Sequence, residues 1–210
     1  MSVQKDRMLR GDLYDANDAE VADDRSRCAL LLERFNAVRV ADDDEHRRLL
    51  FTLLGHAGES AEVKAPLQCD YGFNIHIGDR SSINYAAIIL DCAPVVIGDD
   101  VQIGPAVQLL TATHPLDHKL RKKLLESAMP ITIGDGVWFG AGVIVCPGVA
   151  IGGNTVVGAG SVVTKSLPAH VLAVGNPARV VREIWHCNPA ASHLWVSSIR
   201  FGDHAATSYS

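Results

Sequence analysis

The sequence predicts a mainly β protein, a parallel β-helix preceded by a helical segment, and three observations lead to this fold class. Large apolar residues recur at every sixth position, glycine directly follows four of these six residues, and residues 1–58 show helical spacing instead. The six apolar positions are Ile133, Phe139, Val145, Ile151, Val157 and Val163. A period of six is neither helical nor a simple strand alternation. It is typical of short strands joined by tight turns, whose stacked coils bury one aliphatic ladder.

Residues 1–58 are expected to form a small helical cap over the first coil. Their apolar residues make two stripes at helical spacing: Val21, Cys28, Leu31, Leu32, Phe35 and Val38 in the first, and Leu49, Leu50, Leu53 and Leu54 in the second. Asp42 and Glu45 have the spacing of a capping box, and Gly55 is expected to end the second helix.

Residues 59–168 are predicted to form the β-helix itself. The same six-residue period appears upstream in Ile97, Ile103 and Leu109 and, in another phase, in Ile77, Ile83 and Ile89. A polar insertion at residues 110–132 interrupts it. In a solenoid, insertions become loops on one face, and such loops often build the functional site.

The chain after the last repeat is predicted to close the open coil. Residues 169–186 are interpreted as a capping segment that ends in a short helix, Arg179–Trp185, because the last coil would otherwise expose unpaired strand edges. Residues 187–210 show no clear period and are left as a tail.

Composition excludes several classes of function. The net charge of −5 and the pI near 5.9 argue against nucleic-acid binding, which normally needs a basic face. The five cysteines contain no Cys-x-x-Cys pair, which argues against a zinc knuckle or a disulfide scaffold. With no charged-then-apolar leader, a cytoplasmic location is expected. The charge-free run from Gly136 to Thr164 contains eight glycines, and its apolar residues recur every six positions, so we do not expect a membrane helix or a membrane partner.

Five motifs occur in one order along the chain and carry a resemblance to a known family. They are Met8-Leu9-Arg10-Gly11-Asp12-Leu13-Tyr14, Cys69-Asp70-Tyr71-Gly72-Phe73-Asn74-Ile75, Leu90-Asp91, Thr111-Ala112-Thr113-His114-Pro115 and Gly175-Asn176-Pro177-Ala178-Arg179. Together with the repeats, they resemble the maltose/galactoside O-acetyltransferases, which include the nodulation-type sugar acetyltransferases. The resemblance extends from about Lys5 to Ile184. It implies a left-handed β-helix and a homotrimer that binds acetyl-CoA, with no metal, in a groove between subunits.

Acetyl transfer from a thioester to an alcohol needs a base within hydrogen-bond reach of the hydroxyl, and histidine is the natural choice near neutral pH. His114 opens the insertion, beside Pro115. A histidine in a loop is most often a solvated side chain, but the resemblance places His114 on the catalytic histidine of the family. The same resemblance places the donor to the thioester oxygen near Ala141. Galactoside-type relatives carry a serine there, so here only the backbone N–H of Ala141 would serve.

The acceptor is expected to be a sugar, or another small alcohol, bound by Asp70, Asn84 and Asp91, whose side chains hydrogen-bond hydroxyl groups. The alternative role for Asn84 is that of a turn residue whose side chain hydrogen-bonds its own backbone. Arg25 matches a family arginine that reaches the acceptor pocket; the alternative is an ion pair on the surface of a helix.

Two departures from the galactoside-type pattern favour a maltose or glucose acceptor. Cys92 stands where those enzymes have a second carboxylate, and Ser82 where they have a tyrosine.

Cationic residues near the end of the repeats are candidates for binding the phosphates of CoA. They are the pair Thr164 and Lys165, together with Arg179 and Arg182, which would share one helical face. By resemblance, Ala159 makes a backbone contact with the pantetheine arm. A second basic run, Lys119, Arg121, Lys122 and Lys123, is interpreted as a solvated loop.

Three other functions remain as alternatives. A xenobiotic acetyltransferase acting on an antibiotic hydroxyl would share the donor site and the base. A zinc hydratase of the gamma carbonic anhydrase type would use His76, His114 and His118 as ligands. A catalytically inactive scaffold is the third.

Overall fold

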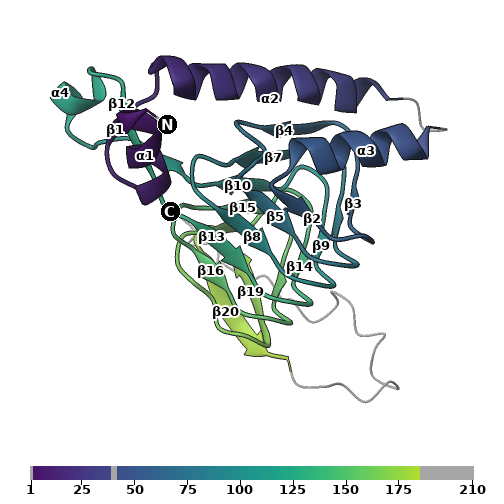
Figure 1. Cartoon of the computed structure of the whole chain (residues 1–210). Coiled ribbons are helices and arrows are strands. Elements are labelled where there is room, and N and C mark those ends of the chain that lie inside the picture. Colours follow the sequence, from purple (N-terminus) through teal and green to yellow (C-terminus); the bar gives the residue numbers. More distant parts are fainter. Residues whose placement is uncertain (1, 39–41, 185–210) are drawn as a thin grey trace, which may run out of the picture.

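The computed structural model describes residues 2–38 and 42–184, and residues 56–175 wind into a parallel β-helix with three sheets (Figure 1). The predicted fold class is confirmed. Paired residues lie 20 positions apart in the first coils, as in His56 opposite His76, and 18 apart in the last, as in Trp138 opposite Val156. Each coil therefore contributes one short strand to each sheet.

The three sheets run the length of the β-helix. The first contains β2 (His56–Ala57), β5 (Ile75–Ile77), β8 (Val95–Ile97), β13 (Ile131–Ile133) and β16 (Ala150–Ile151). The second contains β3 (Glu62–Val63), β6 (Ser82–Ile83), β9 (Gln102–Ile103), β14 (Trp138–Phe139), β17 (Val156–Val157), β19 (Val171–Gly175) and β20 (Ala178–Glu183). The third contains β4 (Leu67–Cys69), β7 (Ala87–Leu90), β10 (Gln108–Leu110), β15 (Ile144–Val145) and β18 (Val162–Val163).

The apolar ladder forms the core, as the sequence predicts. All six residues from Ile133 to Val163 are at most 2% exposed, and the upstream residues of the same beat are buried as well. Burying each such side chain stabilises the fold by about 1.5–3 kcal/mol.

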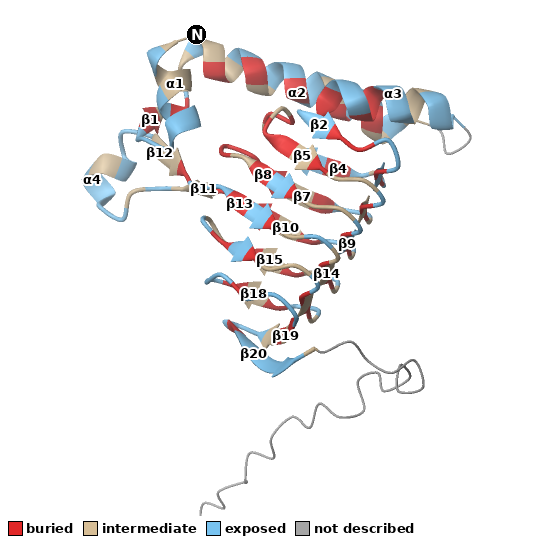
Figure 2. Ribbon diagram, turned by 60° about the horizontal axis from the view of Figure 1, so that its bottom comes forward, coloured by how far each residue is buried: buried red, intermediate tan, exposed pale blue. Residues whose placement is uncertain are grey.

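Three helices cover the first coil. They are α1 (Val3–Arg10), α2 (Ala19–Ala37) and α3 (Asp43–Leu53), and the buried faces of α2 and α3 turn toward the strands (Figure 2). Most residues of the two predicted stripes are buried, and Leu31 and Val38 are partly buried against the same core.

The helix α3 ends before Gly55, as predicted, but the predicted capping box does not form. The Asp42 side chain makes no capping hydrogen bond, and the carboxylate of Glu45 accepts hydrogen bonds from Arg48 at 2.6 and 2.7 Å. Gly55 does not end the helix through a left-handed conformation. It is needed for a close approach instead, since a Cβ there would lie 2.0 Å from the carbonyl oxygen of Phe73.

The strand β4 lies at the edge of the third sheet, and α2 covers it. The Asn36 side chain accepts a hydrogen bond from the backbone N–H of Leu67 and donates one to its carbonyl, both at 2.9 Å. One amide side chain thus takes the place of a further strand, which protects the edge from pairing with another chain.

The insertion forms a hairpin with a short helix at its tip. The chain leaves β10 and forms β11 (Ala112–Thr113), α4 (His118–Arg121) and β12 (Leu125–Ala128) before it returns at β13. On its other side β12 pairs with β1 (Tyr14–Asp15), so the order of this small antiparallel sheet is β1-β12-β11. The N-terminal segment therefore fixes the insertion in place.

The predicted C-terminal helix is wrong over the residues that the structure describes. Arg179 and Arg182 lie on β20, which pairs antiparallel with β19. The chain reverses after Gly175, which has a φ of +102°, and β19 offers an unpaired edge on the last coil. The β-branched Val180 and Val181 favour the strand. Trp185 and the tail 187–210 lie outside the described residues.

The charge-free run from Gly136 to Thr164 contributes the strands from β14 to β18. Among the described residues, no helix is both long and apolar enough to cross a membrane.

Candidate functional site

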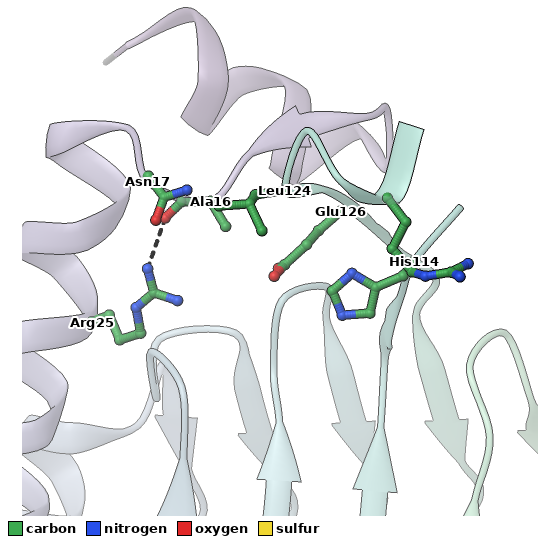
Figure 3. Close-up of a pocket in the computed structure, with 7 residues that line it drawn as sticks. Ala16, Asn17, Arg25, His114, Leu124 and Glu126 are labelled. Atoms are coloured by element: carbon green, nitrogen blue, oxygen red, sulfur yellow. Dashed lines mark hydrogen bonds between the residues drawn. The ribbon is translucent and has the colours of Figure 1, made fainter. Parts of the chain in front are cut away.

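His114 lies in a cleft of about 250 Å³ between the N-terminal cap and the insertion (Figure 3). The cleft is lined by Ala16, Asn17, Arg25, His114, Arg121, Leu124 and Glu126. His114 directly follows β11 and its imidazole is accessible to solvent. Five of the seven lining residues are polar or charged, and they include an imidazole, two guanidinium groups and a carboxylate, which suits a ligand with several hydroxyl groups.

Arg121 fixes the loop that follows His114. Its guanidinium donates to the carbonyl oxygens of Pro115 at 2.9 Å and Leu116 at 3.1 Å. Lys119, Arg121, Lys122 and Lys123 are all exposed, as expected for a solvated loop, and Arg121 in addition holds the backbone of that loop.

Arg25 reaches the same cleft from α2. It donates to the carbonyl oxygen of Ala16 at 2.7 Å, which aims the guanidinium across the cleft toward the insertion (Figure 3). The surface ion pair considered as an alternative for Arg25 is not found within the described part of the chain.

Asp70 lies behind Arg25, at the end of β4. Burial raises the pKa of its carboxyl, while the hydrogen bond from the Cys92 thiol (3.4 Å) and the positive charge of Arg25 lower it. Asp70, Cys92 and Arg25 therefore lie close together, but of the three only Arg25 lines the cleft.

Asp91 has a structural role rather than the predicted contact with the acceptor. Its side chain is 0% exposed, and one carboxylate oxygen accepts the backbone N–H groups of Asp70 (3.0 Å) and Tyr71 (2.9 Å). Burial nevertheless raises the pKa of Asp91 to about 6, against the opposing effect of these hydrogen bonds. Asp91 fixes the turn that carries Asp70.

Glu126 lines the cleft and Tyr14 holds its carboxylate, although no pattern in the sequence predicts a site role for Glu126, and Tyr14 occurs only as the last residue of the first motif. The Tyr14 hydroxyl donates to Oε2 of Glu126 at 3.0 Å, and the two residues are directly opposite in the pairing of β1 with β12. They are 112 positions apart, so no local pattern signals the contact.

Two residues predicted to contact acetyl-CoA, the donor of the acetyl group, lie at another corner of the β-helix. Ala141 and Ala159 occupy equivalent turns of adjacent coils, and the Ala141 carbonyl accepts the N–H of Gly160 at 2.9 Å. Close packing requires glycine here, since a Cβ on Gly140 would lie 2.5 Å from the nitrogen of Ala159. Ala141 and Ala159 are exposed.

Asn84 lies at this corner as well, directly after β6. Its Oδ1 accepts the backbone N–H of Tyr85 at 2.8 Å, which is the local turn bond considered as its alternative role.

One chain does not bring the two corners together. Ala141 precedes β15, which runs parallel to β10, whereas the insertion with His114 leaves from the far end of β10. The strands of the third sheet therefore lie between His114 and the corner with Asn84, Ala141 and Ala159 within one chain.

The predicted phosphate-binding residues are exposed at the last coils. Thr164 and Lys165 follow β18, and Arg179 and Arg182 lie on β20. Because both arginines lie on a strand, the prediction that they share one helical face is wrong.

The histidines considered as zinc ligands do not form a cluster. In residues 2–38 and 42–184, no group of three or more His, Cys, Asp or Glu side chains is arranged to hold a metal ion.

Comparisons with known proteins agree on one family. Residues 7–58 match the maltose acetyltransferase hexapeptide capping motif, and residues 130–165 match six repeats of the bacterial transferase hexapeptide. The chain is 40% identical over 179 residues to the galactoside O-acetyltransferase of Escherichia coli, a match that covers 85% of this chain and 88% of that protein.

Two solved structures are similar over nearly their whole length. A maltose O-acetyltransferase from Clostridium difficile has a TM-score of 0.86 and 43% identity, with 88% of this chain and 98% of that chain covered. A hexapeptide-repeat acetyltransferase from Vibrio cholerae, in complex with acetyl-CoA, has a TM-score of 0.82 and 39% identity, with 88% of this chain and 100% of that chain covered.

Proposed function

Because the chain belongs to the maltose and galactoside O-acetyltransferase family and is an acetyl-CoA-dependent acetyltransferase, we propose that it acetylates a sugar hydroxyl with His114 as the general base. The observation that carries this proposal is the cleft around His114. Its imidazole shares about 250 Å³ with Asn17, Arg25 and Glu126, which are groups that hydrogen-bond a polyol.

The chemistry is direct transfer in a ternary complex. His114 takes the proton of the acceptor hydroxyl as its oxygen attacks the thioester carbonyl carbon. A tetrahedral intermediate forms, the C–S bond breaks, and the leaving thiolate of CoA takes the proton from the imidazolium. The backbone N–H of Ala141 is the proposed donor to the developing oxyanion.

The donor is proposed to lie along the corner of Ala141 and Ala159. These residues are exposed and stacked on adjacent coils, which suits an extended pantetheine arm. Lys165, Arg179 and Arg182 are the cations proposed to bind the phosphates of CoA, with Thr164 beside them.

The active site is proposed to form between subunits of a homotrimer. The base and the donor corner lie on opposite sides of the third sheet in one chain, so a second copy is needed to bring them within reach of one acetyl group. In this arrangement the cap (residues 1–58) and the insertion supply the acceptor side, and the β-helix of the neighbour supplies the donor side.

The acceptor is proposed to be a glucose- or maltose-type sugar. Position 92 carries a cysteine where galactoside-type enzymes have a second carboxylate, and the Cys92 thiol donates to Asp70. A sugar is then recognised by Asp70, Arg25 and, from the neighbouring subunit, Asn84.

A free-thiol release assay tests this function. The purified protein is incubated with acetyl-CoA and a panel of glucose, maltose, thiogalactosides and alcohols of antibiotics, and the acetylated product is identified by mass spectrometry. We expect the highest kcat/KM with glucose or maltose. A preference for an antibiotic alcohol would reject the sugar acceptor, and no release above hydrolysis with every acceptor would reject the proposal.

A further inference from the structure

Glu126 is a carboxylate of the cleft that the mechanism above does not use. It comes from β12, and its carboxylate projects into the space between Arg25 and His114 (Figure 3). A half-buried carboxylate at such a place needs partners, because desolvation of an unpaired charge is unfavourable.

Tyr14 supplies one of these partners. Its side chain is 0% exposed, and its hydroxyl donates to Oε2 of Glu126 at 3.0 Å. The backbone fixes the same pair, because Tyr14 and Glu126 are opposite each other in the pairing of β1 with β12.

We propose that Glu126 is a specificity-determining residue that accepts hydrogen bonds from acceptor hydroxyls adjacent to the one acetylated, and that Tyr14 is the positioning residue that holds its carboxylate. This inference rests on the proposed sugar acceptor. It concerns which molecules bind, and leaves the proton transfer to His114.

The hydrogen-bonding capacity of the cleft supports this role. A carboxylate offers about four lone-pair sites, and Tyr14 occupies one of those of Glu126. Asp70 is held in a similar way by the thiol of Cys92. Glu126, fixed by a buried donor, thus leaves acceptor sites in the cleft for a ligand that donates several hydrogen bonds, and Asp70 lies beyond the lining, close to Arg25. A polyol is such a ligand and a monohydric alcohol is not.

The rival role for Glu126 is to orient the imidazole of His114. The two roles differ in what they change. An orienting carboxylate would alter kcat and its pH profile for every acceptor, whereas an acceptor-binding carboxylate alters KM only for acceptors with adjacent hydroxyls.

The experiment compares Glu126→Gln, Tyr14→Phe and the double variant with the wild type. The matched control is Glu62→Gln, because Glu62 is an exposed residue of β3. Thiol release is measured at saturating acetyl-CoA with the best sugar and with a monohydric alcohol, and circular dichroism verifies folding. Because a hydrogen bond to a charged group contributes about 1.5–3 kcal/mol, we expect Glu126→Gln to raise KM for the sugar about tenfold or more. Its kcat, its pH profile and KM for acetyl-CoA should stay within about twofold.

Tyr14→Phe should raise KM for the sugar by a smaller factor and have no further effect in the Glu126→Gln background, because the two residues act as one unit. If Tyr14→Phe does not fold, Glu126→Gln alone decides. An unchanged KM for the sugar in Glu126→Gln, or equal losses of kcat for both acceptors, would overturn this inference while sugar acetylation stands. Failure of the wild type to acetylate any sugar would instead reject the proposed function, and this inference with it.

Discussion

His114 is the residue on which the proposed chemistry depends. Replacing it with alanine should lower kcat by about two to four orders of magnitude, the usual contribution of a positioned base, and should change acetyl-CoA binding little. His118→Ala is the matched control, because His118 lies on α4 of the same insertion but outside the lining of the cleft. Steady-state thiol release measures both. Near-normal turnover in His114→Ala, or an equal loss in His118→Ala, would remove His114 from the mechanism.

Asp91 gives the site a pH-dependent stability. Burial raises its pKa in the folded state to about 6, above the value expected for the unfolded chain. The carboxyl therefore binds its proton more tightly when folded. Its contribution to stability is complete below the unfolded-state pKa and is lost as the pH rises through about 6.

Asp91→Asn removes this titration. From about pH 4.5 to about pH 7, the unfolding free energy of the wild type should fall by about 2 kcal/mol relative to that of the variant. The variant should be less stable at every pH, because its NH2 group replaces Oδ2, which accepts the backbone N–H of Asn74 at 3.4 Å. Urea titrations at the two pH values measure the difference. Parallel pH dependences in the two proteins would show that Asp91 does not titrate in this range.

At the residue scale, the sequence predicts the role of a residue well where a local motif marks it, and poorly where the role depends on partners far away along the chain. The motif that resembles the family selects His114, and the interruption of the repeat predicts that it lies in a loop; Arg25 and Asp70 do approach each other. The prediction that Asp91 contacts the acceptor fails because its carboxylate accepts hydrogen bonds from backbone N–H groups of another coil, which no side-chain pattern reveals. Glu126 was missed for the same reason, since its partner Tyr14 is 112 positions away.

At the scale of elements, Asn36 joins the cap to the β-helix. Asn36→Ala removes both hydrogen bonds to Leu67 and leaves a partly buried N–H and carbonyl unsatisfied. The unfolding free energy should fall by about 1–3 kcal/mol. Asn36→Asp, which keeps the acceptor and loses the donor, should lie between the wild type and the alanine variant. Equal stability of all three proteins in urea titrations would show that α2 is held by its apolar face alone.

The elements also show why some predictions from sequence fail. The six-residue period specifies the strands because each buried position recurs in every coil, and the structure buries that ladder throughout. Residues 179–184 have no such repetition. The free edge of β19 decides their conformation, so a segment with helical apolar spacing becomes a strand.

At the scale of the whole molecule, the proposed acceptor side and the proposed donor side do not meet within the described chain. His114 lies beyond the carboxyl end of β10, where the insertion leaves the third sheet, whereas Ala159 lies at the other end of these strands, in the turn before β18. The proposed homotrimer would solve this geometry, because each of its three identical interfaces would bring one acceptor side to one donor side. Neither period nor composition reveals such an assembly, since it depends on surfaces that come together only between folded copies.

Mixed trimers test this division. His114→Ala removes the base, and Ala159→Trp fills the proposed donor groove from an exposed position without changing the core. Each variant alone should be inactive. When the two are unfolded, mixed in equal amounts and refolded together, about one site in four should combine an intact His114 with an intact donor corner from the next subunit, so about a quarter of wild-type activity should return. Mixing the two folded proteins without unfolding is the control and should restore nothing. No recovery after co-refolding, with trimers present by light scattering, would place His114 and Ala159 in sites built from a single chain.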